Sequence, residues 1–177
     1  MFSNHILMKK TMALCSLVLI CSAFLFVACK KSKNSTELKV NLTDAPYNAQ
    51  QVNVDIKEVN VNFNGDSTGW IKLETAAGIY DLLKLQNGVD TLLAAGTVPT
   101  GTLKELRFVL GTQNTIMIDS VVYPLSTPSS QQSGLKIKFN RNLSAGLDSL
   151  LIDFDAALSI SKDGNGNYIL QPVLKLK

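Results

Sequence analysis

From Glu37 onward, apolar and polar residues alternate along the chain, which is the pattern of strands with one buried face. The alternation is regular in "ELKVNL" and again in "VNVDIKEVNVNF". In the second segment the apolar residues stand at even positions up to Ile56 and at odd positions from Val59. Because one extra residue in a strand shifts this phase, we predict a β-bulge at Lys57 and Glu58.

Further short strands follow, separated by residues that favour turns. The alternation recurs in "WIKLE", "TLKELRFVLG", "NTIMIDSVVYPL", "LKIKF", "LIDFDAALSI" and "YILQPVLKLK". "NGDSTG" and "KDGNGN" are expected to close hairpins, and Pro172 favours an edge or bulge position in the last strand. "GIYDLLKLQNG" and "DTLLAAGTVPTG" could each form a short strand or a helical turn. Short strands without a long helical segment predict an all-β fold, an antiparallel β-sandwich, over residues 37–177.

Two aspartates, Asp153 and Asp155, stand one residue apart in the apolar run "LLIDFDAALSI". Strand parity places both on the face opposite Phe154. Because Asp is disfavoured in strands, two aspartates on one face indicate a specific partner or role. Three explanations are open: ion pairs with Lys136 and Lys138 on a neighbouring strand, a cation site, or a pair of catalytic carboxylates as in glycosidases. We favour the lysine pairing, because a flat strand presents no evident cleft.

The first 36 residues have the pattern of a bacterial lipoprotein signal. Lys9 and Lys10 precede residues 11–28, which carry no charge, and then come Cys29 and the polar stretch "KKSKNST". A basic start, an apolar segment and a small residue before the cut point describe a secretory signal, and "FVAC" resembles a lipobox. We predict a signal peptide at residues 1–28, and a lipidated Cys29 with a polar tether at residues 29–36. The alternative is a single transmembrane helix, because ~18 apolar residues just span a bilayer.

The inventory of reactive side chains excludes several classes of enzyme. Cys15 and Cys21 would leave with the signal peptide, and the only histidine, His5, precedes the cut point. The mature chain would therefore lack the residues for Ser-His-Asp or Cys-His catalysis and for a zinc or copper site. It also has no Walker loop and no GxGxxG motif. We expect no cofactor, and we assign no catalytic residue.

Charge argues against a nucleic-acid partner. The whole chain carries a formal charge of +3, but from Glu37 onward there are 12 basic and 14 acidic residues, a net charge of −2. A nucleic-acid-binding domain would present a basic field instead. The expected partners are the membrane, through the lipid on Cys29, and either a glycan or another envelope protein.

The segment "DGNGNY" resembles a calcium loop, with Asp163, Asn165 and Asn167 at alternate positions. A loop of EF type needs Gly at the sixth place and Glu at the twelfth. Those places hold Tyr168 and Leu174, so we predict a hairpin turn rather than a metal site.

Scattered aromatic residues offer a further candidate surface. Four of them could form a sugar-stacking platform, although their spacing is more typical of core and rim positions: Trp70, Tyr47, Tyr80 and Tyr123. Arg107 stands in the middle of a predicted strand, where we expect a partly buried ion pair with Asp81.

The order of the segments "LTDAP", "YDLLKLQNG", "PTGTLKELRFVLG", "PSSQQSGLKI", "DFDAALSI" and "YILQPVLK" resembles the domain of unknown function 4382. This family occurs in lipoproteins of Bacteroidetes and other bacteria, and the resemblance covers residues 38–175. It implies a β-sandwich of immunoglobulin-like or transthyretin-like type at the cell envelope, with no established activity. The recurring polar positions of the family fall on Asp44, Asp81, Arg107, Ser133, Lys136, Asp153 and Asp155, and none has an assigned role.

Two functions are open from the sequence. The first is a non-catalytic binding or structural module of the cell envelope, with contacts through loops such as "TDAPYNAQQ" and "STPSSQQSG". The second is a carboxylate- or calcium-dependent glycan hydrolase, which would need four carboxylates to converge: Asp44, Asp81, Asp153 and Asp155. We favour the module.

The residues that follow Cys29 bear on its location. Surface lipoproteins of Bacteroidetes often carry acidic residues at this point, whereas this chain has Lys30, Lys31 and Lys33. By that analogy we expect the protein on the periplasmic side of the outer membrane.

Overall fold

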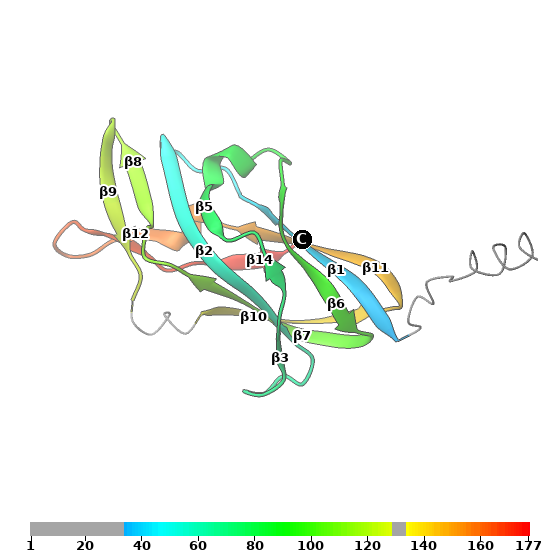
Figure 1. The fold of residues 1–177 in the computed structure, drawn as a ribbon. Coiled ribbons are helices and arrows are strands. Elements are labelled where there is room, and N and C mark those ends of the chain that lie inside the picture. Colours follow the sequence, from blue (N-terminus) through cyan, green and yellow to red (C-terminus); the bar gives the residue numbers. More distant parts are fainter. Residues whose placement is uncertain (1–33, 129–133) are drawn as a thin grey trace, which may run out of the picture. The chain divides into compact units, whose positions relative to one another are not determined.

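The computed structural model describes residues 34–128 and 134–177, whose regular elements are almost all strands (Figure 1). Residues Ser32–Lys177 form a compact unit of their own. The predicted signal peptide, Cys29 and most of the tether lie outside the described residues, and so does Ser133. Across the two described ranges, no helix has the length and apolar character needed to span a membrane.

Five strands form the first sheet. Their spatial order is β14 (Leu174–Leu176), β11 (Gly146–Phe154), β1 (Ser35–Thr43), β6 (Thr91–Pro99) and β4 (Glu74–Thr75). On β1, Leu38, Val40 and Leu42 are fully buried, as their alternation predicts. Since β1 begins at Ser35, the sheet includes the last two residues of the expected tether.

Nine strands form the second sheet. Seven follow one another as β10 (Leu135–Leu143), β7 (Gly101–Leu110), β2 (Gln51–Asn62), β8 (Thr115–Ile118), β9 (Val121–Ser126), β13 (Tyr168–Leu170) and β12 (Ile160–Lys162). Two more pair with the long strand β2: β3 (Trp70–Lys72) and β5 (Gly78–Asp81). Two short helices complete the described elements, the 3₁₀ helix η2 (Leu82–Leu85) and α2 (Ala156–Ser159).

The apolar faces of the two sheets enclose one hydrophobic core, so the predicted all-β sandwich is confirmed. Leu150 and Phe154 from the first sheet and Val61 and Phe108 from the second are at most 1% exposed. The predicted bulge is also confirmed, because the register of β2 against β7 shifts between Ile56 and Glu58. It lets both apolar phases of β2 face the core.

The predicted hairpins form as well. β2 pairs with β3, β8 with β9, and β12 with β13, each antiparallel. The turn between β8 and β9 consists of Asp119 and Ser120, whose φ angles of 50° and 64° are typical of tight two-residue hairpin turns.

The sheets are mixed rather than purely antiparallel, which corrects the sequence-based expectation in one respect. β1 and β11 run parallel, and so do β13 and β9. Alternation of side chains determines which face of a strand is buried, but it carries no information on the direction of the neighbouring strand.

Two segments that were expected to be continuous strands are broken where the chain passes between sheets. "LIDFDAALSI" leaves the first sheet at Phe154, forms α2, and joins the second sheet as β12. "YILQPVLKLK" leaves the second sheet after β13 and joins the first as β14, with Pro172 in the break. We call these two breaks, residues 155–159 and 171–173, together with the neighbouring positions of Asp44, Asp153, Lys175 and Lys177, the crossing region.

Candidate functional site

The structure does not bring the six predicted polar residues together. It places them in three regions: Asp44, Asp153 and Asp155 at the crossing region, Arg107 and Lys136 on the outer face of the second sheet, and Asp81 at the start of η2.

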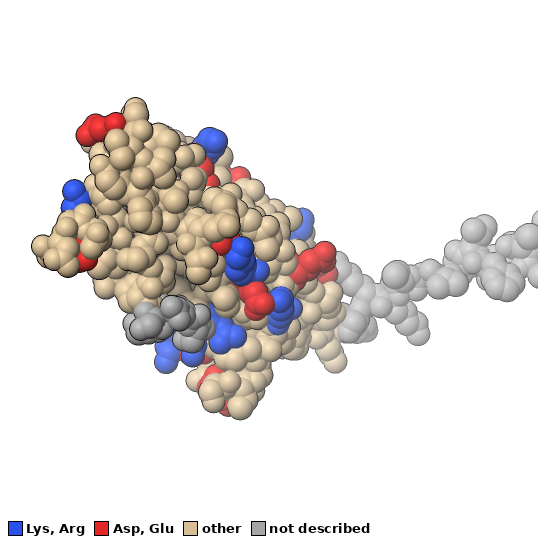
Figure 2. Space-filling view, turned by 60° about the vertical axis from the view of Figure 1, so that its left-hand side comes forward, with Lys and Arg blue, Asp and Glu red and all other residues tan. Residues whose placement is uncertain are grey.

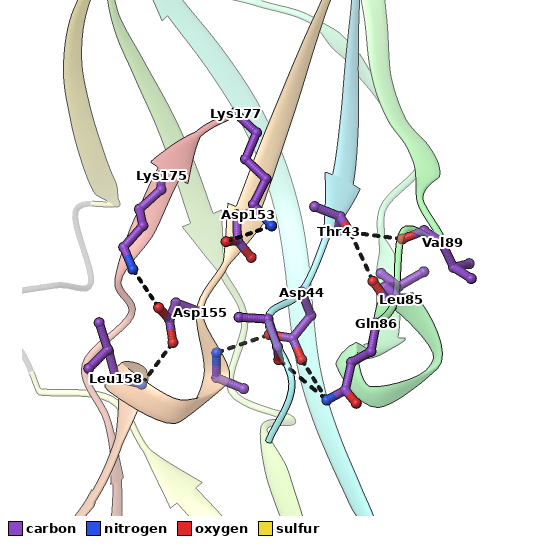
Figure 3. Close-up of polar contacts among 12 residues, drawn as sticks. Thr43, Asp44, Leu85, Gln86, Val89, Asp153, Asp155, Leu158, Lys175 and Lys177 are labelled. Atoms are coloured by element: carbon purple, nitrogen blue, oxygen red, sulfur yellow. Dashed lines mark hydrogen bonds and ion pairs between the residues drawn. The ribbon is translucent and has the colours of Figure 1, made fainter. Parts of the chain in front are cut away.

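Asp155 connects the two crossings of the chain (Figure 3). Its side chain caps α2 by accepting a hydrogen bond from the Leu158 backbone N–H at 3.0 Å, and it pairs with the Lys175 ammonium at 2.6 Å. Burial alone would raise the pKa of Asp155, but Lys175, the Leu158 N–H and the charge of Lys177 outweigh it and hold the pKa below the ordinary value. The carboxylate is therefore stabilised in its ionised form by the fold itself.

Asp153 has a second lysine as its partner. Its Oδ2 atom lies 3.1 Å from Nζ of Lys177, the side chain is nearly buried, and Oδ1 is buried without a hydrogen-bond partner. Lysine pairing is thus confirmed for Asp153 and Asp155, but the predicted lysines are wrong. Lys136 and Lys138 lie on β10 in the other sheet, whereas β11 is paired with β14, which supplies Lys175.

Asp44 fastens the end of β1 to two other segments (Figure 3). It accepts hydrogen bonds from the Ala156 backbone N–H at 3.0 Å and from the Gln86 side-chain amide at 3.1 Å. Burial raises its pKa, the two hydrogen bonds oppose this only partly, and the nearby charge of Asp153 adds to it. The adjacent Thr43 hydroxyl hydrogen-bonds to the carbonyls of Leu85 and Val89, at 2.9 and 2.8 Å.

Ser159 and the backbone complete this region. The Ser159 hydroxyl accepts a hydrogen bond from the Val173 N–H, and its carbonyl accepts one from the Gln171 N–H, both at 2.8 Å. The Asp155 N–H donates to the Val173 carbonyl at 3.0 Å. The polar groups of the crossing region are thus used mainly to hold one crossing against the other. Within the described ranges, no three His, Cys, Asp or Glu side chains are placed to hold a metal ion.

Asp81 lies elsewhere and does not pair with Arg107, contrary to the expectation. Its carboxylate caps η2 through the Leu83 N–H at 3.3 Å and lies 3.6 Å from the Lys84 ammonium. Along β2, Asp81 is opposite Asn53 and Arg107 is opposite Asn60. Seven residues of strand correspond to about 23 Å, too far for an ion pair.

Arg107 and Lys136 meet at an aromatic ring instead. They are direct cross-strand neighbours on β7 and β10, and both lie over the ring of Trp70, at 4.4 and 5.5 Å from its centroid. In the part of the chain that the structure describes, neither cation forms an ion pair with a carboxylate. The other three predicted aromatics are core and rim residues: Tyr47 and Tyr80 pack against the core, and Tyr123 against Tyr168.

Sequence reasoning missed the buried polar residues on the outer face of the second sheet, Asn60, Asn62 and Glu105. Asn62 organises the turn before β3, because its Oδ1 accepts from the backbone N–H groups of Asn64 and Gly65 at 2.7 and 3.1 Å. The alternation of Asn60 and Asn62 on β2, and of Glu105 on β7, indicates that these residues face outward. That they are nevertheless buried becomes visible only in the folded structure, where the turn before β3 covers part of this face.

A hollow of about 340 Å³ opens beside these residues. It is lined by Gly65, Lys104, Glu105, Lys138, Phe139 and Asn140.

The segment "DGNGNY" forms the predicted hairpin turn between β12 and β13. The Asp163 carboxylate accepts hydrogen bonds from the backbone N–H groups of Asn165 and Asn167, at 2.9 and 2.8 Å.

These features define the protein as a two-sheet β-sandwich whose most conspicuous carboxylates serve its own fold. The chain belongs to the family described as a domain of unknown function (DUF4382), which matches residues 35–172. The resemblance inferred from the sequence is thereby confirmed, and the matched region begins at the first residue of β1. No curated protein and no solved structure is significantly similar to the chain.

Proposed function

We propose that this chain is a cell-envelope lipoprotein whose β-sandwich is a non-catalytic binding or structural module. The N-terminal sequence supports the lipoprotein part: Lys9 and Lys10, an uncharged segment, and Ala28 before Cys29. Cys29 would carry the lipid and anchor the protein to the outer membrane. Lys30 and the basic residues after it favour the periplasmic side.

The observation that carries the non-catalytic part is the way in which the carboxylates are used. Asp153 and Asp155 are paired with Lys177 and Lys175, and Asp44 accepts hydrogen bonds from Ala156 and Gln86. A hydrolase would need such carboxylates to face a cleft where they could reach a substrate. Asp81, the fourth candidate, lies apart from these three residues and caps η2.

The predicted tether limits where the sandwich would lie. Five residues, numbers 30–34, separate Cys29 from β1, and fully extended they reach ~18 Å. A lipid on Cys29 would hold the start of β1 close to the headgroups.

The anchoring proposal is tested by replacing Cys29 in the full chain produced in a Gram-negative bacterium. We expect the unaltered chain to be in the outer-membrane fraction and to incorporate an alkyne analogue of palmitate. Cys29→Ala should abolish labelling, because the acylated sulfur is gone. Cys21→Ala is the matched control, since that cysteine lies inside the predicted signal and its loss should leave labelling intact.

The same experiment separates the alternatives. A transmembrane helix would keep Cys29→Ala in the membrane and leave the unaltered chain unlabelled, which would contradict the lipid anchor. Protease added to intact cells should spare the protein if it faces the periplasm, and degradation would place it on the cell surface instead.

A further inference from the structure

Basic residues predominate on the outer surface formed by β3 and by residues 58–62 of β2, 104–107 of β7 and 135–138 of β10, and we call this surface the basic face. Its charged residues are Lys72, Lys104, Arg107, Lys136 and Lys138, with Glu58 and Glu105 as the only acids among them. Five basic and two acidic residues give a net charge of +3, although residues 37–177 together carry −2. Figure 2 shows Lys and Arg side chains gathered in the lower half of that view, interspersed with carboxylates.

The two acids of the basic face are already used by two of its lysines. Glu58 pairs with Lys72 at 2.5 Å, and Glu105 lies 3.6 Å from Lys138. Arg107 and Lys136 remain opposite each other, and neither forms an ion pair among the described residues. Glu58 is near Arg107, since Lys72 chiefly, with help from Asn60 and Arg107, lowers the pKa of that carboxyl. Like charges directly opposite across a sheet are destabilising, so the fold gains nothing from this pair by itself.

Arg107 is nevertheless held firmly in place. The guanidinium lies over the Trp70 ring, and Gly134 packs against the stem of the side chain so closely that an added Cβ would lie 2.7 Å from the Arg107 Cγ atom. Gly134 has a φ of 97°, so this position favours glycine for two reasons. The Arg107 Nε atom is buried without a hydrogen-bond acceptor. A guanidinium fixed in this way is pre-organised for an anion.

The hollow beside the pair has the size of a small ligand site. Its volume of about 340 Å³ lies at the lower end of the range for such sites, and Lys104 and Lys138 line it. Glu105 also lines it. Arg107 and Lys136 lie two residues from Glu105 and Lys138 on the same strands, which places the cation pair about 7 Å from residues that line the hollow.

We propose that the basic face binds an acidic saccharide, with a sugar ring in the hollow and its carboxylate between Arg107 and Lys136. The proposal rests on the binding module proposed above and names its class of ligand. Arg and Lys recognise a carboxylate through charge-assisted hydrogen bonds, and Trp70 offers an apolar surface beside them.

The distribution of apolar residues favours a saccharide over a lipid surface. A membrane-binding face combines basic residues with exposed apolar side chains that enter the bilayer. The exposed large apolar side chains of the described residues all lie outside the basic face: Ile79, Val89, Leu92, Val121, Val122, Tyr123, Leu147 and Leu158.

The test is calorimetric titration of the unit Ser32–Lys177, which has its own core, with an oligogalacturonate and with its methyl ester. We expect the free acid to bind and the ester, which has no charge, to bind at least tenfold more weakly. The double variant Lys136→Gln, Lys138→Gln should reduce affinity for the acid at least about tenfold, because two charged hydrogen-bond donors are lost. Both side chains are exposed, so the variant should fold.

Lys162→Gln is the matched control. Lys162 also lies over an aromatic ring, 4.7 Å from the Tyr168 centroid, but on β12 outside the basic face. It should change affinity less than twofold. Equal binding of acid and ester, no binding of either, a double variant that binds like the unaltered protein, or binding to phosphatidylglycerol vesicles instead of the oligogalacturonate would overturn the proposal. Because this unit lacks Cys29, the result is independent of whether the chain is lipidated.

Discussion

The crossing region and the basic face both hold charged side chains at positions where the sequence is otherwise apolar or alternating, but they use those charges differently. In the crossing region, Asp153 and Asp155 each have a lysine from the last strand or the residue after it, and Asp44 has two hydrogen-bond donors. On the basic face, Arg107 and Lys136 have an aromatic ring and each other.

The difference separates a structural cluster from a candidate binding surface. A buried charge that has an intramolecular partner depends on it, because removing one member of the pair leaves the other uncompensated and destabilises the fold. Charges that form no ion pair within the fold contribute little to stability and stay available to a ligand. If this distinction is correct, substitutions in the two regions have opposite effects on stability.

The largest effect is expected for Asp155→Ala in the crossing region. The substitution removes the cap of α2 and leaves Lys175 without its partner, so we expect the free energy of unfolding to fall by about 2 to 3 kcal/mol. Urea unfolding of Ser32–Lys177, followed by fluorescence of the single tryptophan, measures this loss.

Asp148→Ala is the control for Asp155→Ala, because Asp148 lies on β11, the strand that ends just before Asp155. Asp148 pairs with Arg141 at 3.1 Å, but that arginine is half exposed, and surface pairs contribute at most about 1 kcal/mol. Equal losses in the two variants would show that the crossing region has no special role.

A smaller effect is expected in the pH dependence of the free energy of unfolding, to which Asp155 and Asp44 contribute with opposite signs. The pKa of Asp155 is lowered in the folded protein, so its contribution to stability is present above the unfolded value of about 3.9 and is lost as the pH falls through the folded pKa. The pKa of Asp44 is raised by burial, so folding binds a proton there, and its contribution is most favourable at low pH and is lost as the pH rises through the folded pKa.

Neutral variants test these two signs. Asp155→Asn should be less stable than the unaltered protein at neutral pH, and the difference should shrink as the pH falls through the folded pKa of Asp155. Asp44→Asn should change stability by less than about 1 kcal/mol at neutral pH, because an amide still accepts the Ala156 N–H, and it should become the less stable protein on acidification. Urea midpoints between pH 3 and 7 measure both, and parallel curves would contradict the assignment.

The sequence predicted those features of the fold that depend on neighbouring residues. The phase change between Ile56 and Val59 located the bulge, and "DGNGNY" located a turn. The lysine partners of Asp153 and Asp155 depend on which strands become neighbours, and alternation does not encode that. Asp155 followed by Ala-Ala-Leu-Ser is a helix N-cap signal that could have revealed α2, but the alternating residues before it favoured a longer strand.

For the candidate site, the sequence identified the residues but not their grouping. Arg107 and Lys136 were recognised as polar positions, whereas their contact with Trp70 depends on the turn that brings β3 beside β2. That turn is held by Asn62, whose role is invisible in a strand that simply alternates.

The smallest expected effect tests the basic face directly. Lys136→Glu places a carboxylate opposite Arg107, so we expect the free energy of unfolding to rise by about 0.5 kcal/mol while binding of the oligogalacturonate is lost. Lys138→Glu is the matched comparison, because Lys138 is opposite Glu105 and the variant would set two carboxylates against each other. It should lower stability by a similar amount, and binding should weaken as well. Urea unfolding and calorimetry on both variants give the answer: a fall in stability for Lys136→Glu would mean that the fold, rather than a ligand, depends on the Arg107–Lys136 pair.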